Sequence, residues 1–215
     1  MNPLRIVSFS AVLTCLVIVH AAEILSRAPA GRELAGERTC QTPQHVSTHE
    51  YNVTGATITR RSFSCTGDIS KYRRELPARA ESTSLAVLKQ DNVVECHTGE
   101  NCQCGIQAGC SCGDEPAFAP AVGDCSMLAN SMIIVTQVVG QTFVVEAGGF
   151  ELLSFQSCSV QFNNFQNVPV EYCWDELGKS IGTATQACFN EGGGPTGFCS
   201  GINGLWDVEI ERFSP

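Results

Sequence analysis

Five cysteines lie within the seventeen residues CHTGENCQCGIQAGCSC, at positions 96–112. The segment holds two Cys-x-Cys doublets, at positions 102/104 and 110/112, and His97 follows its first cysteine. Reduced thiolates together with an imidazole could bind Zn²⁺ or Cu(I), whereas oxidised cysteines would cross-link the chain. The chemistry of this segment therefore depends on the compartment in which the protein resides.

The N-terminus, residues 1–22, has the layout of a secretory signal peptide. Arg5 precedes an apolar run at positions 6–19, and the small residues Ala21 and Ala22 offer a cleavage site. The run is shorter than the about 20 residues that a helix needs to cross a bilayer. We therefore expect a secreted, extracellular protein without a membrane span.

The number of cysteines favours disulfides over the metal alternative. The chain has 13 cysteines, and loss of Cys15 with the signal leaves an even number in an oxidising compartment, where disulfides form and persist. We expect no metal and no other cofactor. We also expect the two cysteines of each doublet to point to opposite sides of the chain and to bond to different neighbours. The predicted disulfide cysteines are Cys40, Cys65, Cys96, Cys102, Cys104, Cys110, Cys112, Cys125, Cys158, Cys173, Cys188 and Cys199.

Residues 23–79 differ in charge from the rest of the chain. They hold 9 basic and 6 acidic residues, whereas residues 80–215 hold 3 basic and 16 acidic residues. The segment contains two dibasic pairs typical of processing sites, Arg60 with Arg61 and Arg73 with Arg74. We interpret it as a basic pro-segment or disordered N-terminal region that precedes an acidic mature domain. The alternative is a small N-terminal domain that stays attached.

The positions of the cysteines favour a cut after the second dibasic pair. Cleavage after Arg74 leaves ten cysteines, which can pair completely, whereas cleavage after Arg61 alone separates Cys40 from Cys65. These two cysteines could bridge each other inside the pro-segment. Asn52 is the acceptor of the chain's one Asn-x-Ser/Thr sequence, so an N-glycan would lie in the removable part.

The remaining chain divides into a cysteine-dense loop region, residues 80–117, and a domain at residues 118–215. Helical spacing of apolar residues predicts one helix at 124–135, with Asp124 as a possible cap, and a second within 170–189. Acidic residues in the first turn of the second helix favour its dipole. We therefore expect two helices in this domain.

Strand patterns surround the two predicted helices. Two β-rich runs, at 141–146 and 150–162, are separated by Ala-Gly-Gly, which is a hairpin signal. Near the C-terminus LWDVEIERF alternates, with Trp206, Val208 and Ile210 on one side and acidic residues on the other. We expect an α+β fold, a small disulfide-rich sandwich with helices packed on one face of an antiparallel sheet.

These elements carry a resemblance to a known family. The runs PAVGDC, QTFVVEAG, FQSCSVQF, VEYCWDELGKSIG, ACF and LWDVEI, within about residues 118–212, are similar to the necrosis-inducing effector family of small secreted fungal proteins. That family is related in fold to fungal killer toxins. The resemblance implies a secreted α+β module that acts on other cells or on the producer's own wall, and it carries over no catalytic residue. The cysteine-dense stretch and the extra cysteine in YCWDEL depart from the family pattern.

The sequence gives little support to an enzyme. His97 is the one histidine after residue 80, so a Ser-His-Asp arrangement has a single possible base. Carboxylate pairs could hydrolyse a glycoside, but Glu209 and Glu211 fit the polar side of a strand, and Asp175 and Glu176 fit a helix N-terminus. We expect a protein that is not an enzyme.

Two classes of binding protein remain. The first is an effector- or toxin-like interaction protein, released from a pro-form, that binds a protein at a cell surface. The second is a glycan-binding or cell-wall module in which Phe162, Phe165, Tyr172 and Trp174 stack on sugar rings, although such aromatics more often form a core. The acidic charge disfavours nucleic acid and anionic membranes. We expect a monomer with an extracellular protein or a wall glycan as its partner.

Overall fold

The computed structural model describes Cys40, residues 42–65, the backbone of residues 86–88, Cys96, and residues 101–115 and 118–213. The expected signal peptide, Arg73, Arg74 and His97 lie outside these residues. The strands are β1 Pro43–Val53, β2 Ala56–Cys65, β3 Ala86–Leu88, β4 Ala108–Gly113, β5 Thr142–Val145, β6 Phe150–Phe155, β7 Cys158–Asn164, β8 Val170–Cys173, β9 Thr196–Gly201 and β10 Trp206–Arg212. The helices are α4 Val122–Val139, α5 Trp174–Ala184 and the π-helix η3 Thr185–Asn190.

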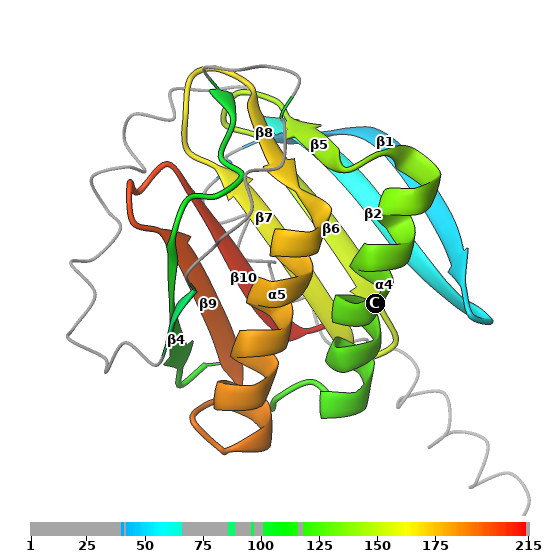
Figure 1. Cartoon of the computed structure of the whole chain (residues 1–215), viewed down its shortest axis with the longest axis vertical. Helices are drawn as coiled ribbons and strands as arrows, with labels where there is room; N and C mark the ends of the chain where they lie inside the picture. Colours follow the sequence, from blue (N-terminus) through cyan, green and yellow to red (C-terminus); the bar gives the residue numbers. More distant parts are fainter. Residues whose placement is uncertain are drawn as a thin grey trace, which may run out of the picture. The chain divides into compact units, whose positions relative to one another are not determined.

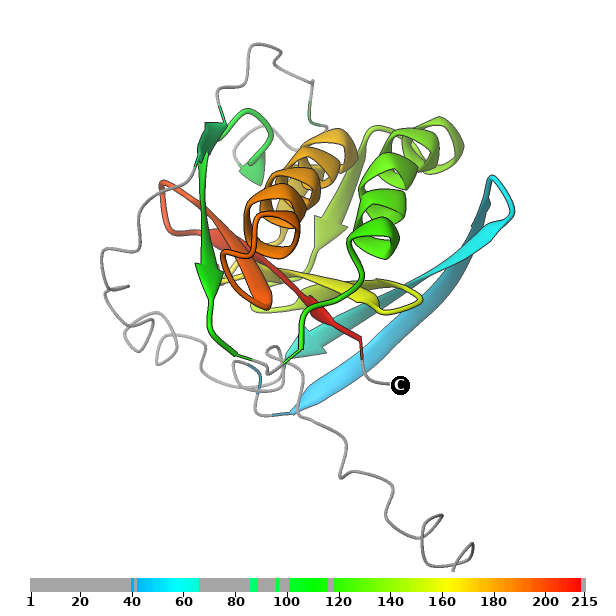
Figure 2. The ribbon, with the colours of Figure 1, turned by 90° about the horizontal axis from the view of Figure 1, so that it is seen from below.

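The described strands form one large sheet and one small sheet. The large sheet has the order β1-β2-β6-β7-β10-β9-β4-β3, and every neighbouring pair is antiparallel. The small sheet pairs β5 with β8. The helices α4 and α5 lie side by side against one face of the large sheet, as Figures 1 and 2 show from two directions. The expected disulfide-rich α+β class is confirmed.

The first predicted helix is present and is longer than expected. α4 runs from residue 122 to residue 139, and Cys125, Leu128, Met132 and Val135 form its buried side at helical spacing. Asp124 is not the cap, because it lies inside the first turn and its carboxylate accepts hydrogen bonds from the backbone N–H and the hydroxyl of Ser157. The helix therefore begins without a side-chain cap, and Asp124 instead ties it to the turn between β6 and β7.

The second predicted helix begins four residues later than its pattern suggested. Residues 170–173 form β8, and α5 starts at Trp174. The four residues of β8 are too few to show a strand period, so periodicity alone did not separate them from the helix that follows. The expected inner positions Leu177, Ile181 and Ala184 are all buried.

The expected hairpin between 141–146 and 150–162 is wrong. β5 pairs with β8 in the small sheet, and the glycines at positions 148 and 149 connect the two sheets. The run 150–162 instead contains the hairpin of β6 and β7, with its tight turn at Gln156 and Ser157. Gln156 has a φ of 50°, a conformation uncommon for a residue with a side chain, and the sequence around it holds no glycine that would mark a turn.

Residues 43–65 belong to the large sheet. β1 and β2 form a hairpin whose turn holds Thr54 and Gly55, both with positive φ. β2 then pairs with β6 from Thr59 to Phe63. Cys40 and Cys65 bond to each other, as the sequence suggested. The sheet therefore runs across the expected boundaries at residues 79 and 117, and the hairpin is an ordered part of it.

Candidate functional site

All twelve predicted cysteines form disulfides. One bond joins Cys40, which precedes β1, to the end of β2, and one closes the loop before β4. The others join that loop to β8, β4 to β9 and to η3, and α4 to β7. The pairs are Cys40–Cys65, Cys96–Cys102, Cys104–Cys173, Cys110–Cys199, Cys112–Cys188 and Cys125–Cys158. The prediction that these cysteines form disulfides is confirmed.

Each Cys-x-Cys doublet bonds to two different neighbours, as expected. In the second doublet, Cys110 bonds to Cys199 on the adjacent strand β9, and Cys112 bonds to Cys188 on η3. The expectation that doublet cysteines point to opposite sides is wrong here, because residues two apart in a strand lie on the same face. The two bonds point in different directions, because Cys199 lies on the neighbouring strand of the sheet and Cys188 lies on η3, outside the sheet.

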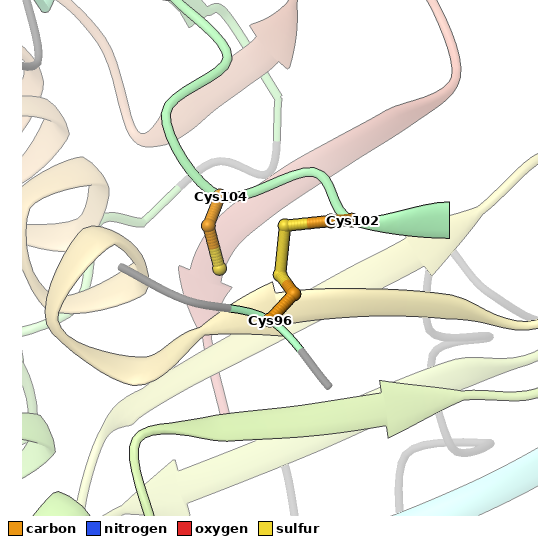
Figure 3. A group of neighbouring side chains, drawn as sticks. All are labelled: Cys96, Cys102 and Cys104. Carbon is orange, nitrogen blue, oxygen red and sulfur yellow. A yellow bond between two sulfur atoms is a disulfide. The ribbon is translucent and has the colours of Figure 1, made fainter. Parts of the chain in front are cut away.

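The first doublet brings three sulfur atoms together. Figure 3 shows the bond between Cys96 and Cys102 next to the side chain of Cys104. The three sulfurs lie within 4.8 Å of one another, and a second group at this distance joins Cys104, Cys173 and the carboxylate of Glu176. Reduced thiolates in these positions would have metal-ligand geometry, but bonded sulfurs carry no thiolate charge to bind a cation. In the oxidised chain this group acts as a cross-link.

Glu176 anchors the cysteine loop to the start of α5. Its two carboxylate oxygens accept the backbone N–H of Gly105 at 2.8 and 3.0 Å. Burial raises the pKa of the neighbouring Tyr172 above its usual range, and the charge of Glu176 raises it further. Tyr172 therefore remains a neutral phenol at any physiological pH. This region is a rigid structural corner held by a disulfide and a buried carboxylate.

Three of the four aromatic residues expected to stack on sugars are core residues. Phe162, Tyr172 and Trp174 are buried, and Phe165 is half-buried. Phe162 contacts Tyr172 with ring centroids 4.8 Å apart and stacks on Trp206 at 5.6 Å. Phe162, Tyr172 and Trp174 cannot present a face to a ligand, because the cluster fills the space between the two sheets and α5.

Arg60 of the first dibasic pair extends into the same core. Its Nε donates to Glu151 Oε2 at 2.8 Å, and its guanidinium lies 4.9 Å from the Trp174 ring. Desolvation lowers the pKa of Arg60, but the hydrogen bond to Glu151 and the charge of that carboxylate outweigh this effect and raise it. The backbone at Arg60 and Arg61, in β2, also pairs with β1 on one side and with β6 on the other. A processing protease would have to open the sheet to cleave there.

On the face of the large sheet that points away from the helices, β7 and β10 carry polar side chains, whereas the neighbouring β6 carries the buried Phe150 and Leu152. Cys158 faces the helices, because it bonds to Cys125 of α4, so alternation turns Ser159, Gln161 and Asn163 to the other side. These three residues stand opposite the acidic residues of β10. We call the carboxylates of Asp207, Glu209 and Glu211, with the amides of Gln161 and Asn163, the acidic face.

Hydrogen bonds join the members of the acidic face. Gln161 Nε2 donates to Asn163 Oδ1 at 2.7 Å, and Asn163 Nδ2 donates to Asp207 Oδ1 at 2.8 Å. The expected alternation of β10 is present on its apolar side, where Trp206 and Val208 are buried. Its polar side is less open than expected, because Glu209 is only 8% exposed. The amides were missed because SVQFNN resembled an ordinary strand segment; the signal was the alternation of Gln161 and Asn163 with the apolar Val160 and Phe162.

Comparisons with known proteins do not assign the chain to a family. Neither the family models, nor the curated proteins, nor the solved structures that were searched gave a match.

Proposed function

We propose that the chain is a secreted, disulfide-stabilised interaction protein, effector- or toxin-like, that binds a basic extracellular partner through its acidic face. The proposal of secretion is supported by the signal-like N-terminus and by six described disulfides, a content typical of extracellular proteins. The resemblance to necrosis-inducing effectors supports the same class of function.

One observation carries the choice of partner: three carboxylates stand in a row on one side of β10. Residues two apart in a strand repeat at about 7 Å, so Asp207, Glu209 and Glu211 form a ladder with that spacing. An extended peptide with lysine or arginine at alternate positions has cations at the same spacing. Asp207 and Glu211 are half-buried and lie at the two ends of the ladder, where a partner can reach them.

The carboxylates of the ladder have contacts within the chain and belong to a chain that is acidic as a whole. All three carboxylates already make polar contacts in the structure, so a partner must exchange with these contacts or add to them. The formal charge of the whole chain is −9 at pH 7, which attracts cationic partners from a distance and repels anionic ones. The affinity for a cationic partner is therefore expected to fall as the salt concentration rises.

A glycan is the second candidate ligand, because the same face holds groups that bind sugars. The half-buried carboxylates of Asp207 and Glu211 can hydrogen-bond sugar hydroxyls, and Phe198 of β9 stands directly opposite Glu209 on β10. Phe198 is half-buried and could stack on a sugar ring, unlike the core aromatics.

The test compares the secreted protein with a charge-neutral variant, Asp207→Asn/Glu209→Gln/Glu211→Gln. The probes are a synthetic peptide with lysine at alternate positions, insoluble chitin and insoluble β-glucan. The matched control, Asp114→Asn/Glu115→Gln/Glu191→Gln, removes the same charge from exposed positions outside β10. We expect the peptide to bind the parent and the control but not the first variant, and to dissociate as salt rises.

Other outcomes contradict this choice of partner. Retention on a polysaccharide at high salt, lost in the β10 variant, would support the glycan candidate instead. Hydrolysis of a polysaccharide that is lost when one carboxylate becomes an amide would make the protein an enzyme.

The release from a pro-form is tested separately by the intact mass of the secreted protein. A mature chain that begins near Glu75 or Ala80 would support processing after the second dibasic pair. A chain that begins at Glu23 would show that residues 23–79 stay attached.

A further inference from the structure

The outer side of α4 is apolar and exposed. Val138 is 73% exposed and Ile133 is 58% exposed, and Met127 is also exposed. Val139, at the end of the helix on the side of Val135, and Val144 of β5 are exposed as well but do not belong to this side. In Figures 1 and 2 this helix lies beside α5 in the layer that covers one face of the large sheet.

The same surface carries no charge. Asp124 is the one ionisable residue among the 18 of α4, and its carboxylate is bonded to Ser157. The polar residues on the outer side are neutral, namely Asn130 and Gln137. The chain has a formal charge of −9, so two copies repel each other over most of their surfaces. At this uncharged side they can meet without bringing like charges together.

The outer side is complementary to itself when the helix is reversed. Gly123, Met127, Asn130, Ile134 and Val138 follow one another at spacings of three or four and so share one side of the helix. The midpoint of α4 lies between residues 130 and 131. In an antiparallel pair about this point, Val138 of one copy meets Gly123 of the other, and Met127 meets Ile134.

The contact at Gly123 has room for a partner's side chain. A Cβ built at Gly123 has no neighbouring atom within 4 Å, so the surface there is open and has no side chain of its own. In a symmetric pair the exposed Val138 of each copy would pack against Gly123 of the other copy. The contact would therefore occur twice, once on each side of the two-fold axis. Asn130 would lie next to the axis, where a polar residue fixes the register of a helix pair.

We propose that α4 is the interface of a two-fold symmetric homodimer in which two α4 helices pack antiparallel. Met127, Ile133 and Val138 present on the order of 300 Å² of apolar surface, comparable to the main patch of a typical monomer. This is less than half of the about 800 Å² per partner of a stable interface. The dimer is therefore weak and forms as concentration rises. This inference replaces the expectation of a monomer and is independent of the acidic face.

A lipid surface fits the same helix less well. By length and composition α4 could cross a membrane, and it is the one such helix among the described residues. Its inner side, however, is core, and Cys125 is bonded to β7, so only the outer side is available. That side holds no tryptophan, lysine or arginine, the residues typical of helices that lie in a membrane interface.

Sedimentation velocity of the secreted protein over a wide range of concentration tests the dimer. We expect a monomer–dimer equilibrium in the parent protein, and we expect Gly123→Lys and Val138→Glu each to weaken self-association at least about tenfold, because each places an unpaired charge in the contact. A mixture of the two variants is expected to regain dimers, because the new lysine meets the new glutamate in the antiparallel register. Ile202→Lys is the matched control at another exposed apolar residue, and it should leave the equilibrium unchanged.

Three results would overturn the proposal. The parent protein could remain a monomer at the highest concentration, or Ile202→Lys could dissociate it as strongly as Val138→Glu does. The parent could also bind neutral phosphatidylcholine vesicles through Val138 while remaining monomeric, which would make a lipid surface the partner of α4.

Discussion

Replacing Arg60 with methionine is expected to lower the free energy of unfolding by about 3–5 kcal/mol, because it leaves the buried carboxylate of Glu151 without its cation. The side chain of Glu151 is 3% exposed and that of Arg60 is 15% exposed, so water can compensate for little of this loss. Glu151 would still accept a hydrogen bond from the Ser62 hydroxyl at 2.9 Å. The contact of the guanidinium with Trp174 is lost as well, which accounts for about 0.5–2 kcal/mol of the total.

The assay is urea unfolding of the oxidised protein, followed by tryptophan fluorescence. The chain has two tryptophans, Trp174 and Trp206, and both are buried in the aromatic core. The double variant Arg60→Met/Glu151→Leu is expected to regain most of the lost stability, because an apolar pair can replace a buried ion pair at little cost. Arg61→Met is the matched control, since Arg61 is half-buried and lies over Phe213 on the other face of the sheet.

The double-mutant cycle decides whether the ion pair stabilises the core as described. If Arg60→Met costs less than about 1 kcal/mol, or if the double variant is as unstable as the single one, then Glu151 is not an uncompensated buried charge and the reasoning fails. A loss at Arg61 equal to that at Arg60 would also refute it, because the effect would then belong to the strand and not to the ion pair.

Three further predictions concern packing and cross-links. Gly178→Ala should destabilise the protein by about 1–3 kcal/mol in the same urea assay, because its Cβ would lie 2.8 Å from the Ala129 carbonyl of α4; an unchanged midpoint would show that the helices can separate freely. Removal of the Cys125–Cys158 bond by paired alanine substitutions should cost roughly 4 kcal/mol for a separation of 33 residues, and a loss below 1 kcal/mol would contradict this. In stepwise reduction with alkylation and peptide mapping, the Cys96–Cys102 bond should be reduced before the buried Cys125–Cys158 bond, because Cys96 and Cys102 are half-exposed and close a short loop; the reverse order would contradict it.

The elements with a clean repeat could be predicted from the sequence. α4 and β10 were identified because their apolar residues recur at helical and alternating spacing, and each has one side in the core. β8 was assigned to a helix because its four residues, VEYC, are too few to show a strand period. Which strands pair is a long-range property, so the pairing of β5 with β8 was not visible in the local Ala-Gly-Gly signal.

The candidate site was less predictable than the fold. The cysteines were identified by type, but their partners are set by the tertiary arrangement, which sequence spacing does not contain. Aromatic residues such as Trp174 are equally compatible with a core and with a ligand surface until burial is known. The acidic face was seen in part, because Glu209 and Glu211 alternate, while Gln161 and Asn163 joined it through the pairing of β7 with β10.

The long sequence separations of three disulfides constrain how the chain can mature. Cys104, Cys110 and Cys112 bond to partners 69, 89 and 76 residues further along the chain. In a chain that enters an oxidising compartment from its N-terminus, these three thiols arrive together and must wait for the last third of the polypeptide. During that time their nearest available partners are each other and the cysteines of the short loop before them. In such a chain these three bonds can form only once the last third of the polypeptide is available, and any premature bond between the early thiols must first be exchanged.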